Sequence, residues 1–195
     1  KRLLMNKALI SIDYTVDFVA DDGKLTAGAP AQAISETIAQ VTEEAFKQGA
    51  YVFFAIDGHD LDDPFHPESK LFPPHNIMGT TGRHLYGPLA NFFKDYQSDA
   101  RVFWMDKRHY SAFSGTDLDI RLRERGVDTV ILTGVLTDIC VLHTAIDAYN
   151  LGYQIQVVES AVASLTVENH QFALNHFKYV LGATLVDEKL NKIKD

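Results

Sequence analysis

Cysteine is nearly absent from this sequence, because its 195 residues include only one, Cys140. A lone cysteine cannot form a disulfide within the chain, so we expect a reducing compartment, the cytoplasm. Long apolar runs are missing too, since no segment approaches the roughly 18 apolar residues of a membrane-spanning helix. The first residues have too short an apolar core for a signal peptide. We expect residues 1–6 to be a tail, with Met5 as the natural start.

Basic residues are scarce relative to acidic ones. The chain has 18 Lys and Arg residues against 26 Asp and Glu residues, which gives a formal net charge of −8. An acidic surface repels the phosphate backbone of nucleic acids and the anionic surface of membranes. We therefore expect neither nucleic acid nor a membrane as a partner.

The apolar segments favour a single domain over residues 1–195. Hydrophobic residues make up 46% of the chain, enough for a sizeable core. Apolar and β-branched runs predict strands at 7–13, 51–56, 101–105, 129–132, 154–158 and 184–186. Helical spacing predicts helices at 30–49, 85–96, 118–125, 138–149 and 167–181. This alternation predicts a Rossmann-like three-layer α/β/α fold, with a six-stranded, mostly parallel sheet and helices on both faces.

Four reactive side chains fall where predicted strands end. Asp13, Asp57 and Lys107 stand at the ends of the first three strands, and Cys140 lies in the turn after the fourth. Parallel α/β sheets bind ligands beyond the carboxyl ends of their strands. The topology alone therefore predicts that these four residues converge on one edge of the sheet.

Cys140 has two interpretations. Free cysteine is among the most buried residue types, so Cys140 can be a small core residue. Alternatively it is a nucleophile in a first helical turn capped by Thr137 or Asp138, where the helix dipole and Lys107 lower the thiol pKa. Asp13 would then accept the thiol proton and later donate it to a leaving group.

The partners of Cys140 have ordinary interpretations as well. Lys107 can belong to a solvated charged turn, and Asp13 can be a turn former at a strand end. The backbone N–H groups of Leu136 and Cys140 are candidates for an oxyanion hole. The three side chains together favour catalysis more than any one of them does.

Histidines and carboxylates accumulate around a long irregular segment, residues 60–82, whose aromatic and histidine content argues against disorder. The candidate ligands for zinc, iron or manganese are Asp57, His59, Glu68 and His75, with His66 as an alternative to Glu68. Spacing alone is a weak signal, because these can equally be ordinary loop residues.

Five motifs follow one another along the chain: Asp13 with Phe18, Asp57-Gly58-His59, Phe72-Pro73-Pro74-His75, Lys107, and the segment from Gly134 to Cys140. In this order, over residues 7–186, they resemble the nicotinamidases of the isochorismatase-like cysteine hydrolases. The chain departs from the family pattern at Phe72, where Trp is frequent, at Gly58, where Ala or Trp is common, and at Asn76, where Cys is frequent.

The resemblance implies an amide hydrolase that converts nicotinamide to nicotinate and ammonia through a cysteine thioester, in NAD salvage, with pyrazinamide as a further substrate. It implies a catalytic triad of Asp13, Lys107 and Cys140. It also implies a cis peptide bond before Leu136, which aims an oxyanion-hole N–H. A homo-oligomer is expected, with a small molecule as the substrate.

The resemblance also implies one divalent metal ion per subunit, most often zinc, with iron or manganese as alternatives. The ligands it implies are Asp57, His59, His75 and either Glu68 or His66. The aromatic residues it places around the pyridine ring are Phe18, Phe72, Tyr110 and Phe113.

Two other functions stay open. A metal-containing relative could cleave another amide or a carbamoyl compound. A phosphoacceptor receiver domain would use Asp13, Asp57 and Lys107 around Mg²⁺. That signalling function leaves Cys140, His59 and His75 unexplained, and it needs its second aspartate after the third strand.

Overall fold

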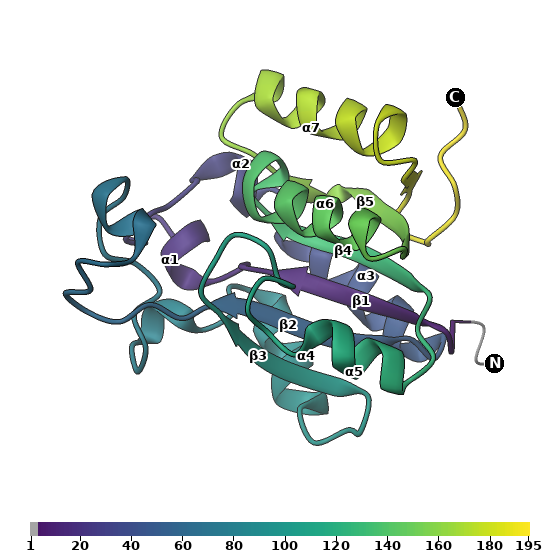
Figure 1. Cartoon of the computed structure of the whole chain (residues 1–195), viewed down its shortest axis with the longest axis horizontal. Helices are drawn as coiled ribbons and strands as arrows, with labels where there is room; N and C mark the ends of the chain where they lie inside the picture. The colour runs from purple at the N-terminus through teal and green to yellow at the C-terminus, as the bar shows by residue number, and fades with distance from the viewer. Residues whose placement is uncertain (1–3) are drawn as a thin grey trace.

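The structure is a computed structural model that describes residues 4–195 as a parallel sheet between two layers of helices (Figure 1). All strand pairs are parallel, and the order is β3-β2-β1-β4-β5-β6. The strands are β1 (Lys7–Ile12), β2 (Tyr51–Asp57), β3 (Val102–Lys107), β4 (Thr129–Val135), β5 (Gln154–Ala163) and β6 (Thr184–Val186). The predicted six-stranded α/β fold is confirmed.

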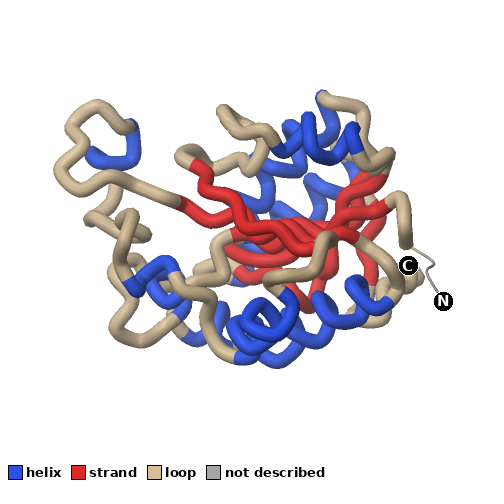
Figure 2. Tube along the Cα trace, turned by 90° about the horizontal axis from the view of Figure 1, so that it is seen from below, coloured by secondary structure: helices blue, strands red, loops and turns tan. Residues whose placement is uncertain are grey.

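Two layers of helices cover the sheet, one on each face (Figures 1 and 2). On one face lie α2 (Ala29–Gln32), α3 (Ser35–Lys47) and α4 (Pro88–Tyr96). On the other lie α5 (Leu118–Glu124), α6 (Leu142–Asn150) and α7 (Val167–Tyr179). Shorter turns are α1 (Val16–Val19), two 3₁₀ turns at Pro67–Lys70 and Thr81–Arg83, and a π turn at Thr137–Val141.

Strand β1 shows why the central strands are continuous apolar runs. Its alternate residues Ala8, Ile10 and Ile12 enter the core under α5, α6 and α7, whereas Leu9 enters the core under α3 and α4. A parallel strand covered on both faces has no solvated side, so it loses the apolar–polar alternation of a surface strand.

The strand order places the site. The chain passes from β1 outward through β2 to β3, then returns to β4 on the other side of β1. The connection that follows β1 therefore leads toward one side of the sheet, and the connection that follows β4 leads toward the other. This divergence opens a crevice beyond the carboxyl ends of these two strands. Those ends point toward α1 and the irregular loop, away from both chain termini (Figure 1).

Gly134 lets β4 run farther than predicted. The prediction ended this strand at residue 132, but it continues to Val135, and Gly134 pairs with Ile12 of β1. Gly134 has a φ of 115°, and a Cβ there would lie 2.0 Å from the Ile12 carbonyl oxygen. Only glycine lets these two backbones approach so closely. The close approach brings the turn after β4 next to the end of β1.

Part of the predicted tail is packed. Lys1 to Leu3 lie outside the described residues, but Leu4 is buried, and its N–H donates to the Gln48 carbonyl at 2.9 Å. Within residues 4–195, no helix has the length and apolar character to cross a membrane.

Candidate functional site

Lys107 stands at the centre of the site. It is the last residue of β3, whereas the prediction ended this strand at residue 105, and it is fully buried. Its Nζ lies 2.8 Å from Asp13 Oδ2, 2.6 Å from Asp57 Oδ1 and 3.6 Å from Cys140 Sγ. The predicted convergence of four strand ends is therefore present, with the ammonium group in the middle.

Backbone contacts hold this arrangement in place. Asp13, with a φ of 54°, accepts at Oδ1 the N–H of Asp57 at 2.8 Å, which joins the ends of β1 and β2. Lys107 Nζ also donates to the carbonyls of His109 at 3.0 Å and Tyr110 at 3.1 Å. One buried ammonium thus fixes two carboxylates and the loop that follows its own strand.

Burial and charge set the protonation of the buried cluster. Burial, together with the charge of Asp57, raises the pKa of Asp13 to about 6. Burial also opposes the charges of Asp57 and Lys107, but the attraction of Lys107 outweighs it at Asp57, and the attraction of Asp13 and then Asp57 outweighs it at Lys107. The pKa of Asp57 is therefore below, and that of Lys107 well above, the ordinary value.

The environment of the Cys140 thiol differs from the prediction. Burial raises the pKa of Cys140 well above its ordinary value, and Lys107 offsets this only in part because Asp13 and Asp57 oppose it. The expectation of a lowered thiol pKa is therefore wrong for the free site. A buried thiol in this setting needs a neighbouring base when it attacks, and an Asp13 carboxylate oxygen lies within 4.8 Å of its sulfur.

The local backbone at Cys140 also differs from the expected capped helix. Cys140 lies in the π turn at 137–141, and α6 begins only at Leu142. Neither predicted cap is made, since Thr137 Oγ1 lies 2.8 Å from His170 Nδ1 and Asp138 Oδ1 accepts Ser164 Oγ at 2.6 Å. Both side chains tie the turn to the segments that follow β5. Single π turns are frequent at functional sites.

The peptide bond between Val135 and Leu136 is cis, as the resemblance implies. Leu136 and Cys140 both line the same cavity. The carbonyl of Leu136 accepts the N–H groups of Ile139 at 3.1 Å and Val141 at 3.2 Å, which closes the turn. The two residues predicted to form the oxyanion hole therefore border one space.

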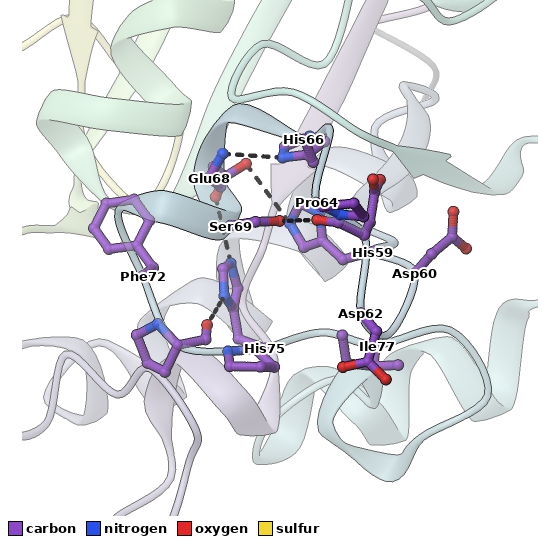
Figure 3. Close-up of a pocket in the computed structure, with 13 residues that line it drawn as sticks. His59, Asp60, Asp62, Pro64, His66, Glu68, Ser69, Phe72, His75 and Ile77 are labelled. Carbon is purple, nitrogen blue, oxygen red and sulfur yellow. Dashed lines mark hydrogen bonds and ion pairs between the residues drawn. The ribbon is translucent and has the colours of Figure 1, made fainter.

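A second cluster lies beside the first, between the end of β2 and the irregular loop. His59 Nε2 is 3.6 Å from both Asp57 Oδ2 and Glu68 Oε2, and His75 Nε2 is 3.4 Å from Glu68 Oε1. Figure 3 shows Glu68 between the two imidazoles. All four residues are buried, and one ligand atom from each lies within 4.8 Å of the others.

The chemistry of this cluster fits a metal ion. The buried atoms Asp57 Oδ2, His59 Nε2, Glu68 Oε2 and His75 Nε2 have no hydrogen-bond partner. Buried polar groups are normally paired, so four converging unpaired acceptors call for a cation. The carbonyl of Pro73 lies 2.8 Å from His75 Nδ1, which places the proton on that nitrogen and leaves Nε2 free as a ligand. Two imidazoles and two carboxylates suit zinc, iron or manganese.

The geometry separates Glu68 from its alternative, His66. Both nitrogens of His66 are already engaged, Nε2 with the Arg108 carbonyl at 2.6 Å and Nδ1 with the Glu68 N–H at 3.1 Å. His66 therefore positions Glu68 from outside the cluster (Figure 3). Its spacing in the sequence could not reveal this, because the choice depends on how the 3₁₀ turn at Pro67–Lys70 is oriented.

Glu68→Gln is accordingly expected to lower zinc affinity far more than His66→Gln. Loss of an outer partner of a metal ligand typically costs 10–100-fold in affinity, so loss of a ligand should cost about 100-fold or more. Competition against a chromogenic chelator measures both constants on folded protein. An equal or larger loss in His66→Gln would reverse the assignment.

A small cavity connects the two clusters. Its volume is about 100 Å³, and for scale a cavity of ~150 Å³ accommodates one benzene molecule. Its walls include Phe18, Leu25, Thr26, Ala27, Asp57, Glu68, Phe72, Tyr110, Val135, Leu136, Ile139, Cys140 and Leu165. The cavity is thus mainly apolar, with the thiol among its lining groups and two members of the second cluster among the others.

Three of the four predicted aromatic residues line this cavity, namely Phe18, Phe72 and Tyr110. Phe113 does not, because it is buried in the core under α5 and α6 and stacks on Tyr153 at 5.7 Å. Sequence reasoning missed the wall formed by Leu25, Thr26 and Ala27. It also missed Leu165, because these residues carry no reactive groups and come from loops.

Comparison with known proteins agrees with this architecture. The family model for the isochorismatase domain matches residues 7–188. The chain belongs to the isochorismatase family. An isochorismatase family protein of Bacillus subtilis (strain 168), PncA, is 52% identical over 183 residues, which cover 94% of this chain and 100% of that one.

Two solved structures to which the chain is similar bear on the site. The pyrazinamidase/nicotinamidase of Streptococcus mutans UA159 is 78% identical, with a TM-score of 0.92 over 92% of this chain and 99% of its own. The pyrazinamidase of Pyrococcus horikoshii, a complex with zinc, is 26% identical, with a TM-score of 0.81 over 93% and 99%.

Proposed function

We propose that this isochorismatase family protein is a nicotinamidase, which hydrolyses nicotinamide to nicotinate and ammonia and also accepts pyrazinamide. The observation that carries the proposal is the cavity bordered both by Cys140 and by Asp57 and Glu68 of the second cluster. We place a flat ring with a basic nitrogen between these groups, with its nitrogen toward the second cluster and its carboxamide at the thiol. The similarity to the pyrazinamidase/nicotinamidase of Streptococcus mutans supports the same substrates.

The second cluster would hold one divalent ion, for which zinc is our first candidate because the pyrazinamidase of Pyrococcus horikoshii is a zinc complex. Asp57, His59, Glu68 and His75 would be the ligands, since their unpaired atoms converge. When bound, the ion supplies an electrophilic partner for the ring nitrogen and so orients the substrate. The aromatic side chains of Phe18, Phe72 and Tyr110 would hold the ring faces.

The catalytic steps follow from the buried cluster that Lys107 forms with Asp13, Asp57 and Cys140. Asp13 accepts the proton of Cys140 as sulfur attacks the amide carbon, and the N–H groups of Leu136 and Cys140 stabilise the oxyanion. The C–N bond then breaks, and Asp13 donates the proton to departing ammonia. Asp13 next removes a proton from water, which attacks the thioester, and the C–S bond breaks with the proton returning to sulfur. Lys107 stabilises the negative charge that develops on sulfur when the thiol loses its proton and again when the C–S bond breaks.

A substrate panel with metal analysis of the same sample tests this function. Nicotinamide and pyrazinamide should both release ammonia. Benzamide, which lacks the ring nitrogen, should lose roughly 100-fold or more in kcat/KM, because a polar partner in the site then stays unmatched. Turnover of a carbamoyl compound with no turnover of nicotinamide would favour the other amidohydrolase function. Equal rates for benzamide and nicotinamide would contradict the role of the cluster in ring recognition.

Cellular location and assembly belong to the same proposal. The single free cysteine fits a reducing cytoplasm, and a homo-oligomer stays a prediction from the family resemblance.

A further inference from the structure

Asp17 carries a buried carboxylate that the proposed chemistry does not use. It lies on the short turn α1 and is only 6% exposed. Its oxygens accept backbone N–H groups, Oδ2 from Asn76 at 2.8 Å and Oδ1 from Lys24 at 3.2 Å. Burying a carboxylate is costly unless such charge-assisted bonds compensate it. The bond from Asn76 joins α1 to a segment far away in the sequence. The bond from Lys24 joins α1 to the segment that follows it and folds back over it.

On one side, Asp17 holds a segment that carries part of the second cluster, called the metal cluster below. Asn76 directly follows His75 and has a φ of 45°, a left-handed conformation that asparagine tolerates better than most residues. The carbonyl of Asn76 accepts the N–H of His59 at 3.0 Å, and its Oδ1 accepts Thr15 Oγ1 at 3.2 Å. The backbone of Asn76 thus connects two histidines of the cluster, and Asp17 fixes its N–H.

On the other side, Asp17 holds a wall of the small apolar cavity in which we place the substrate ring, called the ring cavity below. Its carbonyl accepts the N–H of Leu25 at 3.0 Å, next to the bond from Lys24, and Leu25 lines the cavity. The following residue of α1, Phe18, also lines the cavity and packs edge-on against His75 with 5.3 Å between ring centroids. Asp17 therefore connects the segment that contains His75 and Asn76, the turn α1 and the cavity wall at Leu25.

Gly82 keeps space for this carboxylate. A Cβ at Gly82 would lie 2.1 Å from Asp17 Oδ2, a distance at which one of the groups must move. The φ of Gly82 is not positive, so a larger residue meets a steric obstacle here rather than a backbone one. The space beside Gly82 is shaped around the Asp17 side chain.

We propose that Asp17 is a positioning residue that sets the distance between the metal cluster and the ring cavity. It touches neither the substrate nor a ligand atom, and it acts through the backbone of Asn76 on one side and of Lys24 and Leu25 on the other. The proposal rests on the proposed function insofar as the cluster binds a metal ion and the cavity binds the ring. Its loss should therefore weaken metal binding and substrate binding together.

Asp17→Asn tests this with little change in side-chain shape. An amide keeps one acceptor oxygen but turns the other into a donor, so one of the two N–H bonds is lost. Zinc affinity, measured by chelator competition on folded protein, should fall about 10-fold, the lower end of the cost of an outer partner. With zinc saturating, KM for nicotinamide should rise about 10-fold while kcat changes less than about threefold. A merely structural role would lower the unfolding temperature of the metal-free protein without moving these constants.

Gly82→Ala provides a second route to the same defect, because the added methyl group displaces the Asp17 carboxylate without removing it. It should reproduce both shifts, and it keeps the proposal testable if Asp17→Asn folds poorly. Asp21→Asn is the matched control, since Asp21 is exposed and accepts only the Gln32 side chain at 2.7 Å. It should leave zinc affinity and KM unchanged.

The outcomes separate this inference from the proposed function. Wild-type protein that binds no zinc or releases no ammonia from nicotinamide contradicts the proposed function itself. Wild-type protein that does both, with Asp17→Asn and Gly82→Ala retaining wild-type zinc affinity and KM, overturns the role of Asp17. Equal losses in Asp21→Asn would overturn it too, because the effect would then not depend on the Asn76 contact.

Discussion

Cys140→Ala is expected to abolish ammonia release from nicotinamide, with kcat lowered by roughly 10⁴-fold or more, as for loss of a nucleophile in other hydrolases. Cys140 is the only thiol of the chain, and its sulfur lies beside Lys107 and the carboxylate of Asp13. Alanine removes the attacking atom but leaves the other groups in place. A coupled assay for ammonia, with enzyme in the micromolar range, measures the residual rate.

Two controls show whether the loss is chemical. The variant should keep its zinc content, because Cys140 is not in the second cluster, and its unfolding temperature should stay close to that of the wild type. Any modification of the wild type by iodoacetamide should fall on Cys140 and inactivate the enzyme, since no other thiol competes, and it should be slow because this thiol is buried with a raised pKa. Turnover above a tenth of the wild-type rate in Cys140→Ala would exclude the nucleophile assignment.

The convergence of the catalytic side chains could be predicted because it depends on topology. Parallel strands bring their carboxyl ends to one edge, so Asp13, Asp57, Lys107 and Cys140 had to lie at that edge if the sheet was parallel, and the strand order then brings them into contact. This prediction did not require knowing the exact residue at which each strand ends. Lys107 lies inside β3 rather than after it, yet its long side chain still reaches the crevice.

The electrostatics of the thiol could not be predicted in the same way. Proximity of Lys107 suggested a lowered pKa, but the result depends on how many carboxylates share the ammonium and on how deeply the sulfur is buried. Asp57 provides a second carboxylate at 2.6 Å from Lys107 Nζ. Two anions and burial together outweigh one cation, which explains the raised pKa of Cys140.

The assignment of Phe113 to the ring pocket failed because it depended on the direction of a side chain inside a loop. Phe113 and Tyr110 belong to the same loop, but Lys107 fixes the carbonyl of Tyr110 beside the cavity whereas Phe113 turns into the core. The choice between Glu68 and His66, which are two residues apart, stayed open in the sequence for a similar reason, because only their orientation distinguishes them. Spacing reports which residues are near each other, and it does not report which way a loop side chain points.

Lys107→Met is expected to have the second-largest effect, because it damages both stability and catalysis. Methionine has a similar length but no charge, so the buried carboxylates of Asp13 and Asp57 lose their partner. Breaking a buried ion pair by removing one member typically costs 3–5 kcal/mol, so the free energy of unfolding should fall by about that amount. The kcat should fall by roughly 10³-fold, since the loss of the ammonium removes about 4 kcal/mol of transition-state stabilisation in sites of this kind.

The design of this experiment compares one buried and one exposed lysine. Lys47, which is exposed and pairs with Glu43 at 3.1 Å, supplies the matched control, and Lys47→Met should leave unfolding and turnover unchanged. Lys107→Arg should not restore activity, because a planar guanidinium cannot place one nitrogen among Asp13, Asp57 and the carbonyls that Lys107 Nζ contacts. Denaturant titration gives the free energy and initial rates give kcat. A Lys107→Met protein as stable as the wild type would mean that the two carboxylates are protonated or paired elsewhere, and the central role of the ammonium would have to be abandoned.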